Sequence, residues 1–257
     1  MGEPVLVERR GAVAWCILDR PPLNLLDPEV IGALHEAFTR LSADGTIRAA
    51  VLTGRGRAFT AGMNVHVLQD LDVTRAKTLI ISLHAAIASV HHAPFPVIAR
   101  LNGFALGAGF ELALACDLRV ATAGARLGLP EVRVGVPSVI EAALLPALVG
   151  PGRAAEMLLT GETIDAHQAE AWGLVNHAVP PEGLDAAVDR VVAKVLACGP
   201  AAIRLQKELL VRWRHTDLAT AIEYGINAFA AAYATDEPRE GARAFLEKRA
   251  PRFGGGP

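Results

Sequence analysis

The sequence has few aromatic residues, few cysteines and no long apolar run. Aromatics make up 5% of the 257 residues, so a core must consist mainly of Ala, Val, Leu and Ile. The three cysteines, Cys16, Cys116 and Cys198, are odd in number and widely spaced, which favours buried thiols in a reducing compartment over a disulfide framework. Because no window reaches the roughly 18 apolar residues of a membrane span, we expect no membrane association.

An excess of charge of either sign is also lacking. The formal net charge is −2, which does not support nucleic-acid binding through bulk electrostatics. The N-terminal MGEPVLVERR has neither the apolar core of a signal peptide nor, with Leu6, the myristoylation pattern. The composition, 52% hydrophobic and 20% charged, is that of a globular chain. We therefore expect a cytoplasmic protein with one large domain, or a domain with a smaller lobe.

The first half of the chain alternates strand-like and helix-like segments. We expect a hairpin around Gly11, a helix capped by Asp27, a helix over residues 74–92, and strands at RAAVLTG, PVIARLNG and DLRVATAG. RLGLPEVRVGVPS is interpreted as a loop, and the chain is mostly helical after about residue 138. This alternation predicts an α/β core. The helical tail would be a lid or an oligomerisation lobe.

The glycine-rich turns do not satisfy the nucleotide-binding motifs. Gly107-x-Gly109 meets Leu112 where a dinucleotide fingerprint needs its third glycine, and neither glycine-rich loop carries Gly-Lys-Ser/Thr. The sequence has no G-x-S-x-G, no H-E-x-x-H and no paired cysteine spacing. The adjacent His91 and His92 fit helix capping or solvation better than a metal site.

Two loops rich in small residues remain, FTAGMN and ALGAGFE. Met63 and Ala108 place backbone N–H groups at turns, where a helix start favours a developing negative charge. Two such donors converging on one oxygen would form an oxyanion hole. Glu111 lies about one turn beyond Ala108, and Glu131 could come back beside it. Taken alone, each acid also fits a plain structural role, at a helix N-terminus or in a solvated loop.

The chain resembles the crotonase (enoyl-CoA hydratase/isomerase) superfamily over nearly its whole length. The resemblance is carried by GRAFTAGMN, PVIARLNGFALGAGFELALACDLRVAT, ARLGLPEVRVGVP, AAEMLLTGETIDAHQAEAWGLVNHAV and EGARAFLEKRAPRF. It implies an α/β fold, a spiral of ββα units in residues 1–195 with the catalytic site. Residues 196–257 would form a helical region for trimerisation, and trimers often pair into hexamers.

The resemblance also implies the chemistry. The Met63 and Ala108 N–H groups would hold a thioester carbonyl, Glu111 would deprotonate the water that attacks C3, and Glu131 would protonate C2 of a 2-enoyl-CoA. No cofactor is implied besides the CoA thioester, which is the substrate. Residues expected to bind it are Ala61, Gly62, Asn64, His66, Gly107, Phe245 and Lys248, the last being equally compatible with a plain surface lysine.

The chain departs from the family pattern after the second glutamate. Many relatives have P-G-x-G-G-T-Q-R where this chain reads VPSVIEAALLPALVG, so we expect Ser138, Val139, Ile140 and Glu141 to reshape the acyl pocket. Glu141 would be a third acid near the site or, the favoured interpretation, a surface charge on a helix. Asn64 replaces a common aspartate.

Three functions therefore stay open. An enoyl-CoA hydratase is favoured because both glutamates are present. A Δ3-Δ2 enoyl-CoA isomerase or hydroxyacyl-CoA dehydratase is the alternative, and a non-catalytic CoA-binding homologue is the third. The tail aromatics, Trp213, Tyr224, Phe229 and Tyr233, fit either a subunit interface or the core of a monomer.

Overall fold

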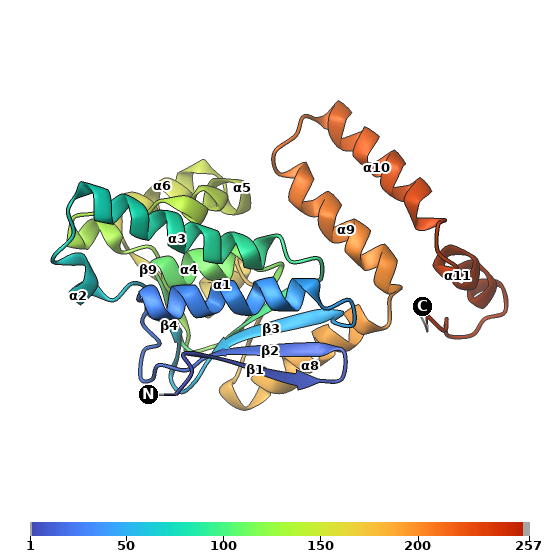
Figure 1. Ribbon diagram of the computed structural model, residues 1–257, viewed down its shortest axis with the longest axis horizontal. Coiled ribbons are helices and arrows are strands. Elements are labelled where there is room, and N and C mark those ends of the chain that lie inside the picture. The colour runs from blue at the N-terminus through green and yellow to red at the C-terminus, as the bar shows by residue number, and fades with distance from the viewer. Residues whose placement is uncertain (1, 254–257) are drawn as a thin grey trace.

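A six-stranded sheet in the order β1-β2-β3-β5-β7-β10 forms the centre of the molecule (Figure 1). The computed structural model describes residues 2–253. The first two strands form the antiparallel hairpin expected around Gly11, and the other neighbours are parallel. The strands are β1 (Val5–Arg10), β2 (Val13–Leu18), β3 (Ala49–Gly54), β5 (Val97–Leu101), β7 (Leu118–Thr122) and β10 (His177–Val179).

A second sheet, in the order β4-β6-β8-β9, lies beside the first. Its strands are β4 (Ala58–Thr60), β6 (Phe104–Leu106), β8 (Arg126–Gly128) and β9 (Thr163–Asp165). The interpretation of RLGLPEVRVGVPS as a loop is wrong in part, because β8 pairs with both β6 and β9 and the 3-10 helix η1 (Glu131–Val134) follows it. These short elements bring Glu131 back toward the first residues after β6.

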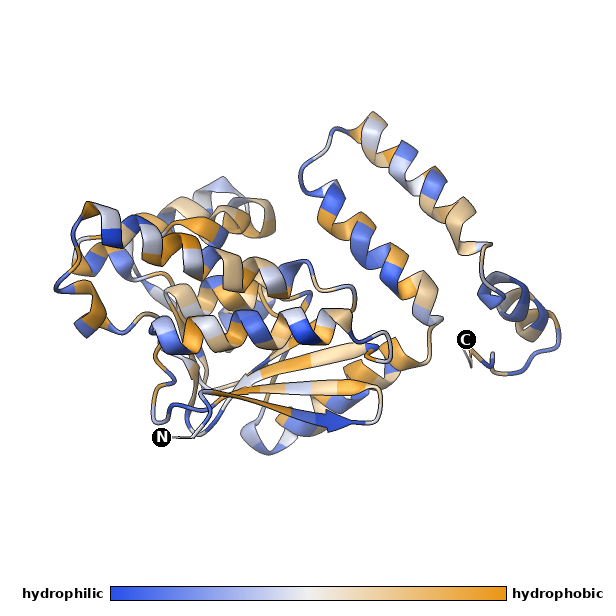
Figure 2. Ribbon diagram, in the orientation of Figure 1, coloured by the Kyte–Doolittle hydropathy of each residue, from blue (hydrophilic) through white to orange (hydrophobic). Residues whose placement is uncertain are grey.

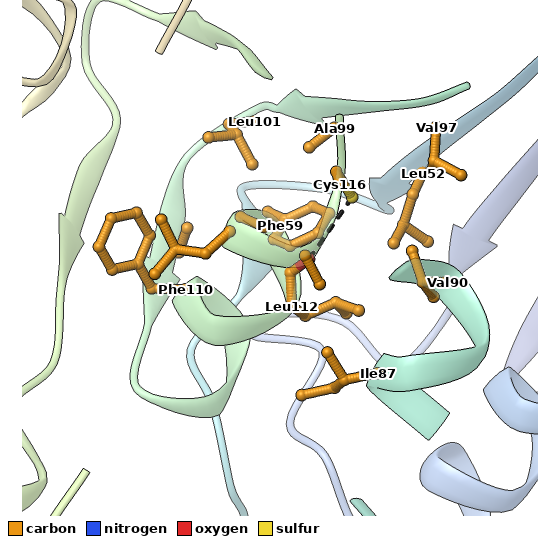
Figure 3. Close-up of a cluster of buried hydrophobic side chains, with 14 of the residues drawn as sticks. Leu52, Phe59, Ile87, Val90, Val97, Ala99, Leu101, Phe110, Leu112 and Cys116 are labelled. Atoms are coloured by element: carbon orange, nitrogen blue, oxygen red, sulfur yellow. Dashed lines mark hydrogen bonds between the residues drawn. The ribbon is translucent and has the colours of Figure 1, made fainter. Parts of the chain in front are cut away.

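The two faces of the large sheet are covered by different helices because side chains alternate along each strand. On β2, Cys16 and Leu18 pack in the cluster that includes α1 and α3, whereas Val13 and Trp15 pack in the cluster that includes α8. Figure 3 shows part of the first cluster, including the Cys116 thiol, which donates to the Leu112 carbonyl at 3.4 Å. The helices of this body are α1 (Pro28–Ala43), α2 (Val65–Leu68), α3 (Val73–His91), α4 (Ala108–Ala115), α5 (Leu145–Val149), α6 (Pro151–Thr160), α7 (Ala166–Ala171) and α8 (Leu184–Leu196), with the 3-10 helices η2 (Ile140–Leu144) and η3 (Pro181–Gly183).

Two features of α1 and α3 bear on the sequence predictions. Asp27 caps α1 as expected and accepts from the Val30 N–H at 3.0 Å. By length and composition α3 could cross a membrane, but it packs against α1 and α4 through core residues such as Leu83 and Ile87. The sequence predicts helix capping or solvation for the two histidines at its end. His92 is the C-cap of α3, whereas solvation does not apply to His91, which is buried and contacts the Ala115 carbonyl.

The last three helices extend from the body as an arm (Figure 1). They are α9 (Pro200–Trp213), α10 (Leu218–Ala232) and α11 (Glu237–Leu246), and the boundary predicted between residues 195 and 196 falls at the end of α8. Figure 2 shows apolar residues along α10, yet none of its side chains is buried. A monomer's own core therefore does not explain Phe229 or Tyr233, and the predicted burial of Cys198 is also wrong because this thiol is exposed.

Candidate active site

The start of α4 is the centre of the site, because a glycine there lets the chain turn directly from β6 into the helix. Gly107 has φ +55° and is the N-cap of α4, a conformation that side-chain-bearing residues rarely adopt. Its N–H donates to the Gly128 carbonyl of β8 at 2.9 Å. The turn thus places Ala108 at the first helical position and Glu111 in the first turn, as the sequence suggested.

The two residues predicted to supply oxyanion donors, Met63 and Ala108, belong to loops that meet at one cavity. Met63 lies opposite Leu26 in an isolated bridge that uses the Gly62 carbonyl and the Asn64 N–H, so the bridge leaves the Met63 N–H free. The Ala108 N–H is the first of α4 and has no intrahelical acceptor. Both residues line one cavity. A Cβ added at Gly62 would lie 3.5 Å from the Ala108 nitrogen, so the two loops are in close contact.

Glu111 is a nearly fully buried acid, with 2% of its surface exposed. Its Oε1 accepts from the Ala142 N–H at 3.2 Å. Burial, then the charge of Glu131, and more weakly the charge of Glu141, raise the pKa of Glu111 to about 8. At neutral pH this carboxyl group therefore holds a proton while it lines a cavity, which is the behaviour expected of an acid–base catalyst.

Glu131 reaches the same place from η1. A Cβ added at Gly107 would lie 2.9 Å from Glu131 Oε1, so the carboxylate lies directly over the turn that starts α4. Its other oxygen accepts from the Ser138 hydroxyl at 2.7 Å. Glycine at position 107 thus serves both the turn and the close approach of this carboxylate. The two glutamates, 20 positions apart in sequence, line one cavity.

The cavity has a volume of about 540 Å3 and is mostly apolar. Its polar end holds the two glutamates and the start of α4. Its other walls come from α2, α3, the connection between them, the end of η1 and the segment that follows it. The residues are Val65, Leu68, Leu71, Ala76, Leu79, Ile80, Leu83, Val134, Val136, Pro137 and Val139. A space of this size and lining suits an elongated apolar group whose reactive end lies at the glutamates.

The predicted binding residues divide into two groups. Ala61, Gly62, Gly107 and Val139 line the cavity. The others are not among the lining residues. Asn64 caps α2 through the N–H of His66, whose side chain is exposed, Ser138 bonds to Glu131, and Ile140 packs against the core. Glu141 is buried, and Phe245 and Lys248 are exposed at the end of the arm. The favoured interpretation of Glu141 as a surface charge is wrong, because only 8% of its surface is exposed.

Sequence reasoning missed the wall supplied by α3. Leu79, Ile80 and Leu83 follow the spacing of one helix face, which predicts burial but not which cavity that face meets. His84, next to Leu83, contacts Glu141, a pairing across 57 positions that no local pattern reveals. Among the described residues no group of three His, Cys, Asp or Glu side chains could hold a metal ion.

Comparison with known proteins gives one consistent family. Residues 8–256 match the family model for enoyl-CoA hydratase/isomerase. A crotonyl-CoA hydratase of Syntrophomonas wolfei is 35% identical over 98% of both chains, and an (E)-benzylidenesuccinyl-CoA hydratase of Thauera aromatica is 34% identical over 98% of this chain and 99% of its own. The crystal structure of a Mycobacterium smegmatis enoyl-CoA hydratase superposes with a TM-score of 0.94 at 34% identity, covering 97% and 98% of the two chains. The fold predicted from the sequence is confirmed.

Proposed function

Because the chain belongs to the enoyl-CoA hydratase/isomerase family, we propose that it is an enoyl-CoA hydratase, a hydro-lyase that adds water across the double bond of a 2-enoyl-CoA. The observation that carries this proposal is the convergence of Glu111, Glu131 and the backbone at Met63 and Ala108 on one cavity. Two carboxyl groups supply an acid and a base, and two N–H groups supply hydrogen bonds to the thioester oxygen.

In the proposed reaction the thioester carbonyl accepts hydrogen bonds from the Met63 and Ala108 N–H groups. The positive end of α4 adds to the stabilisation of the enolate-like oxygen that develops there. Glu111 takes a proton from the water that attacks C3, and Glu131 gives a proton to C2. No cofactor is needed in this scheme, because carboxyl groups and backbone donors perform every step.

The raised pKa of Glu111 favours the protonated form of this carboxyl group near neutral pH. At neutral pH the ligand-free pair holds a proton on Glu111, which is the state that dehydration of a 3-hydroxyacyl-CoA uses and hydration leaves behind. Before hydration the proton must pass to Glu131, and a water shared by the two carboxyl groups would provide the route. Both directions therefore use the singly protonated pair, and both fail when the pair is fully ionised.

We propose that the substrates carry apolar acyl groups, ranging from unbranched chains to moderately bulky groups. The walls beyond the glutamates are aliphatic side chains of α2, α3 and residues 134–139. The relatives' names span a four-carbon crotonyl group and an aromatic benzylidenesuccinyl group, so the scaffold accepts acyl groups of very different size. Lys77 and Arg133 also line the cavity and provide positive charge for the phosphates or the polar arm of CoA.

We propose a homotrimer, or a dimer of trimers, in which the arm of one subunit completes the CoA site of another. The exposed apolar surface of α10, with Phe229 at 70% exposure, supports an intersubunit role. Phe245 and Lys248 lie at the end of the same arm, so a neighbouring subunit is the natural place for their contacts with CoA.

Free cysteines, two of them buried, fit the cytoplasm as the compartment.

The deciding experiment follows the loss of conjugated thioester absorbance with crotonyl-CoA and with longer and branched 2-enoyl-CoAs. We expect hydration of several of these and formation of the 3-hydroxyacyl-CoA. Turnover only of 3-enoyl substrates, tolerant of replacing one glutamate, would instead identify an isomerase. Binding without any turnover would identify a CoA-binding homologue.

A further inference from the structure

Glu141 is a buried carboxylate that the proposed reaction does not use. Its Oε1 lies 2.8 Å from Nδ1 of His84, within hydrogen-bond distance. Its Oε2 is buried and has no hydrogen-bond partner within the part of the chain that the structure describes. Burying such a group is unfavourable, so a chain that keeps it needs a compensating role.

The backbone around Glu141 connects it to Glu111. The next residue, Ala142, donates its N–H to Glu111 Oε1 at 3.2 Å. The preceding residue, Ile140, has φ +32°, an unfavourable conformation for a β-branched residue that surrounding contacts must hold. The bond from His84 on α3 is one such contact, because it fastens η2 at the point where η2 meets Glu111.

We propose that His84 and Glu141 form a positioning pair for Glu111. The pair holds η2 so that the Ala142 N–H meets the Glu111 carboxyl group, and it keeps a further carboxyl group close to Glu111. This inference rests on the proposed function of Glu111 as an acid–base residue. His84 is half exposed, so the pair also links the buried carboxyl group to solvent.

The charged groups around Glu111 are few, which makes the effect of Glu141 measurable. Glu111 is the sole charged residue of α4, and it faces Glu131 of η1 and Glu141 of η2. Glu141 in turn faces His84 and, at longer range, His92, both at α3. Lys77 and Arg133 line the cavity itself. A like charge raises the pKa of a carboxyl group, so neutralising Glu141 must lower the pKa of Glu111.

The first test reads the Glu111 carboxyl group directly, without substrate. Carbon-13 NMR titration of the whole protein follows its resonance, which is assigned by its loss in Glu111→Gln. In Glu141→Gln we expect the midpoint to fall by about one pH unit. Glu156→Gln, which removes an exposed carboxylate on α6, is the matched control and should leave the midpoint unchanged. An unchanged midpoint in Glu141→Gln would overturn the proposal.

The second test separates positioning from simple destabilisation. His84→Ala should lower kcat for hydration by about tenfold with little change in KM, since small displacements of a catalytic group are costly. His84→Asn places an amide donor near the position of Nδ1 and should restore most of the rate. Equal rates for the alanine and asparagine variants, with both folded by circular dichroism, would contradict the pair. If the wild type hydrates no enoyl-CoA but the NMR midpoint still shifts, the proposed function fails and the pair stands.

Discussion

Helices α4 and α10 are both markedly apolar, yet they have opposite environments. Every residue of α4 is buried, including its one acid, Glu111. No residue of α10 is buried, although Ile222, Ile226 and Phe229 would suit a core. The chain surrounds α4 with β4, β6, α3 and η2, whereas α10 contacts mainly α9 (Figure 1).

This difference separates a helix that its own chain buries, α4, from a helix whose apolar side chains would be buried only on association with another subunit, α10. The acid of α4 is buried by its own chain and lies near two other carboxyl groups, Glu131 and Glu141, and together these effects raise its pKa to about 8, although the Ala142 N–H bond acts in the opposite direction. The apolar residues of α10 gain little from their own chain and would be covered on association. We therefore expect the catalytic residues to be positioned within one protomer, and the exposed apolar surface of the arm to be buried between protomers.

Removing the acid of α4 should have the largest effect. Glu111→Gln takes away a catalytic proton site, and we expect kcat for hydration to fall by about 10³- to 10⁴-fold. In Glu131→Gln we expect kcat for hydration to fall by a similar factor. Both are checked by the absorbance assay with crotonyl-CoA, with Glu156→Gln on α6 as the control. Full activity in either glutamate variant would exclude the two-glutamate mechanism.

Introducing charge on the exposed face of α10 should disrupt association of the subunits. The double variant Ile226→Asp/Phe229→Asp should shift the protein from trimer to monomer in size-exclusion chromatography with light scattering, because it puts charge into a desolvated contact. Leu159→Asp is the matched control, being an exposed leucine outside the arm, on α6. A double variant that stays trimeric, or a wild type that is already monomeric, would remove α10 as the interface.

Truncating one aliphatic side chain in each helix should sharpen the contrast. Leu112→Ala on α4 empties core volume and should cost about 3 kcal/mol of unfolding free energy. Ile222→Ala on α10, a residue 55% exposed, should cost well below half of that at protein concentrations where the protein is monomeric. Urea unfolding at two protein concentrations measures both. Equal costs in the monomer would show that α10 packs against its own chain.

The same contrast explains how far the sequence could predict the structure. Strands such as RAAVLTG, the capped helix after Asp27 and the turn at Gly107 follow from local patterns, and all are found. The family match, carried by several long segments in order, gave the fold and the enoyl-CoA hydratase function, both of which the comparisons support. The positions of Glu111 and Glu131 on one cavity also follow from it, while their catalytic roles stay predictions.

What the sequence could not predict depends on contacts across long separations. Glu141 looked like a surface charge because its neighbours in sequence do not bury it; α3, 57 positions earlier, does. Leu79 and Leu83 show a buried helix face, but whether that face meets core or cavity is decided by where η1 and η2 return. The exposure of α10 was equally hidden, since an apolar helix looks the same whether its own chain or another covers it.

The smallest expected effect is a pH dependence that belongs to α4 alone. With a pKa of about 8, Glu111 keeps its proton below that pH and loses it above, and the fully ionised pair is inactive in both directions. The kcat/KM of hydration should therefore decline above about pH 8, roughly tenfold per pH unit. The Ile226→Asp/Phe229→Asp variant should keep this limb at the same midpoint, because the charges of α10 lie outside the cavity. If the midpoint of the alkaline decline in kcat/KM shifts in the α10 variant, the pKa of Glu111 depends on subunit association. The contrast between α4, which is completed by its own chain, and α10 would then be wrong.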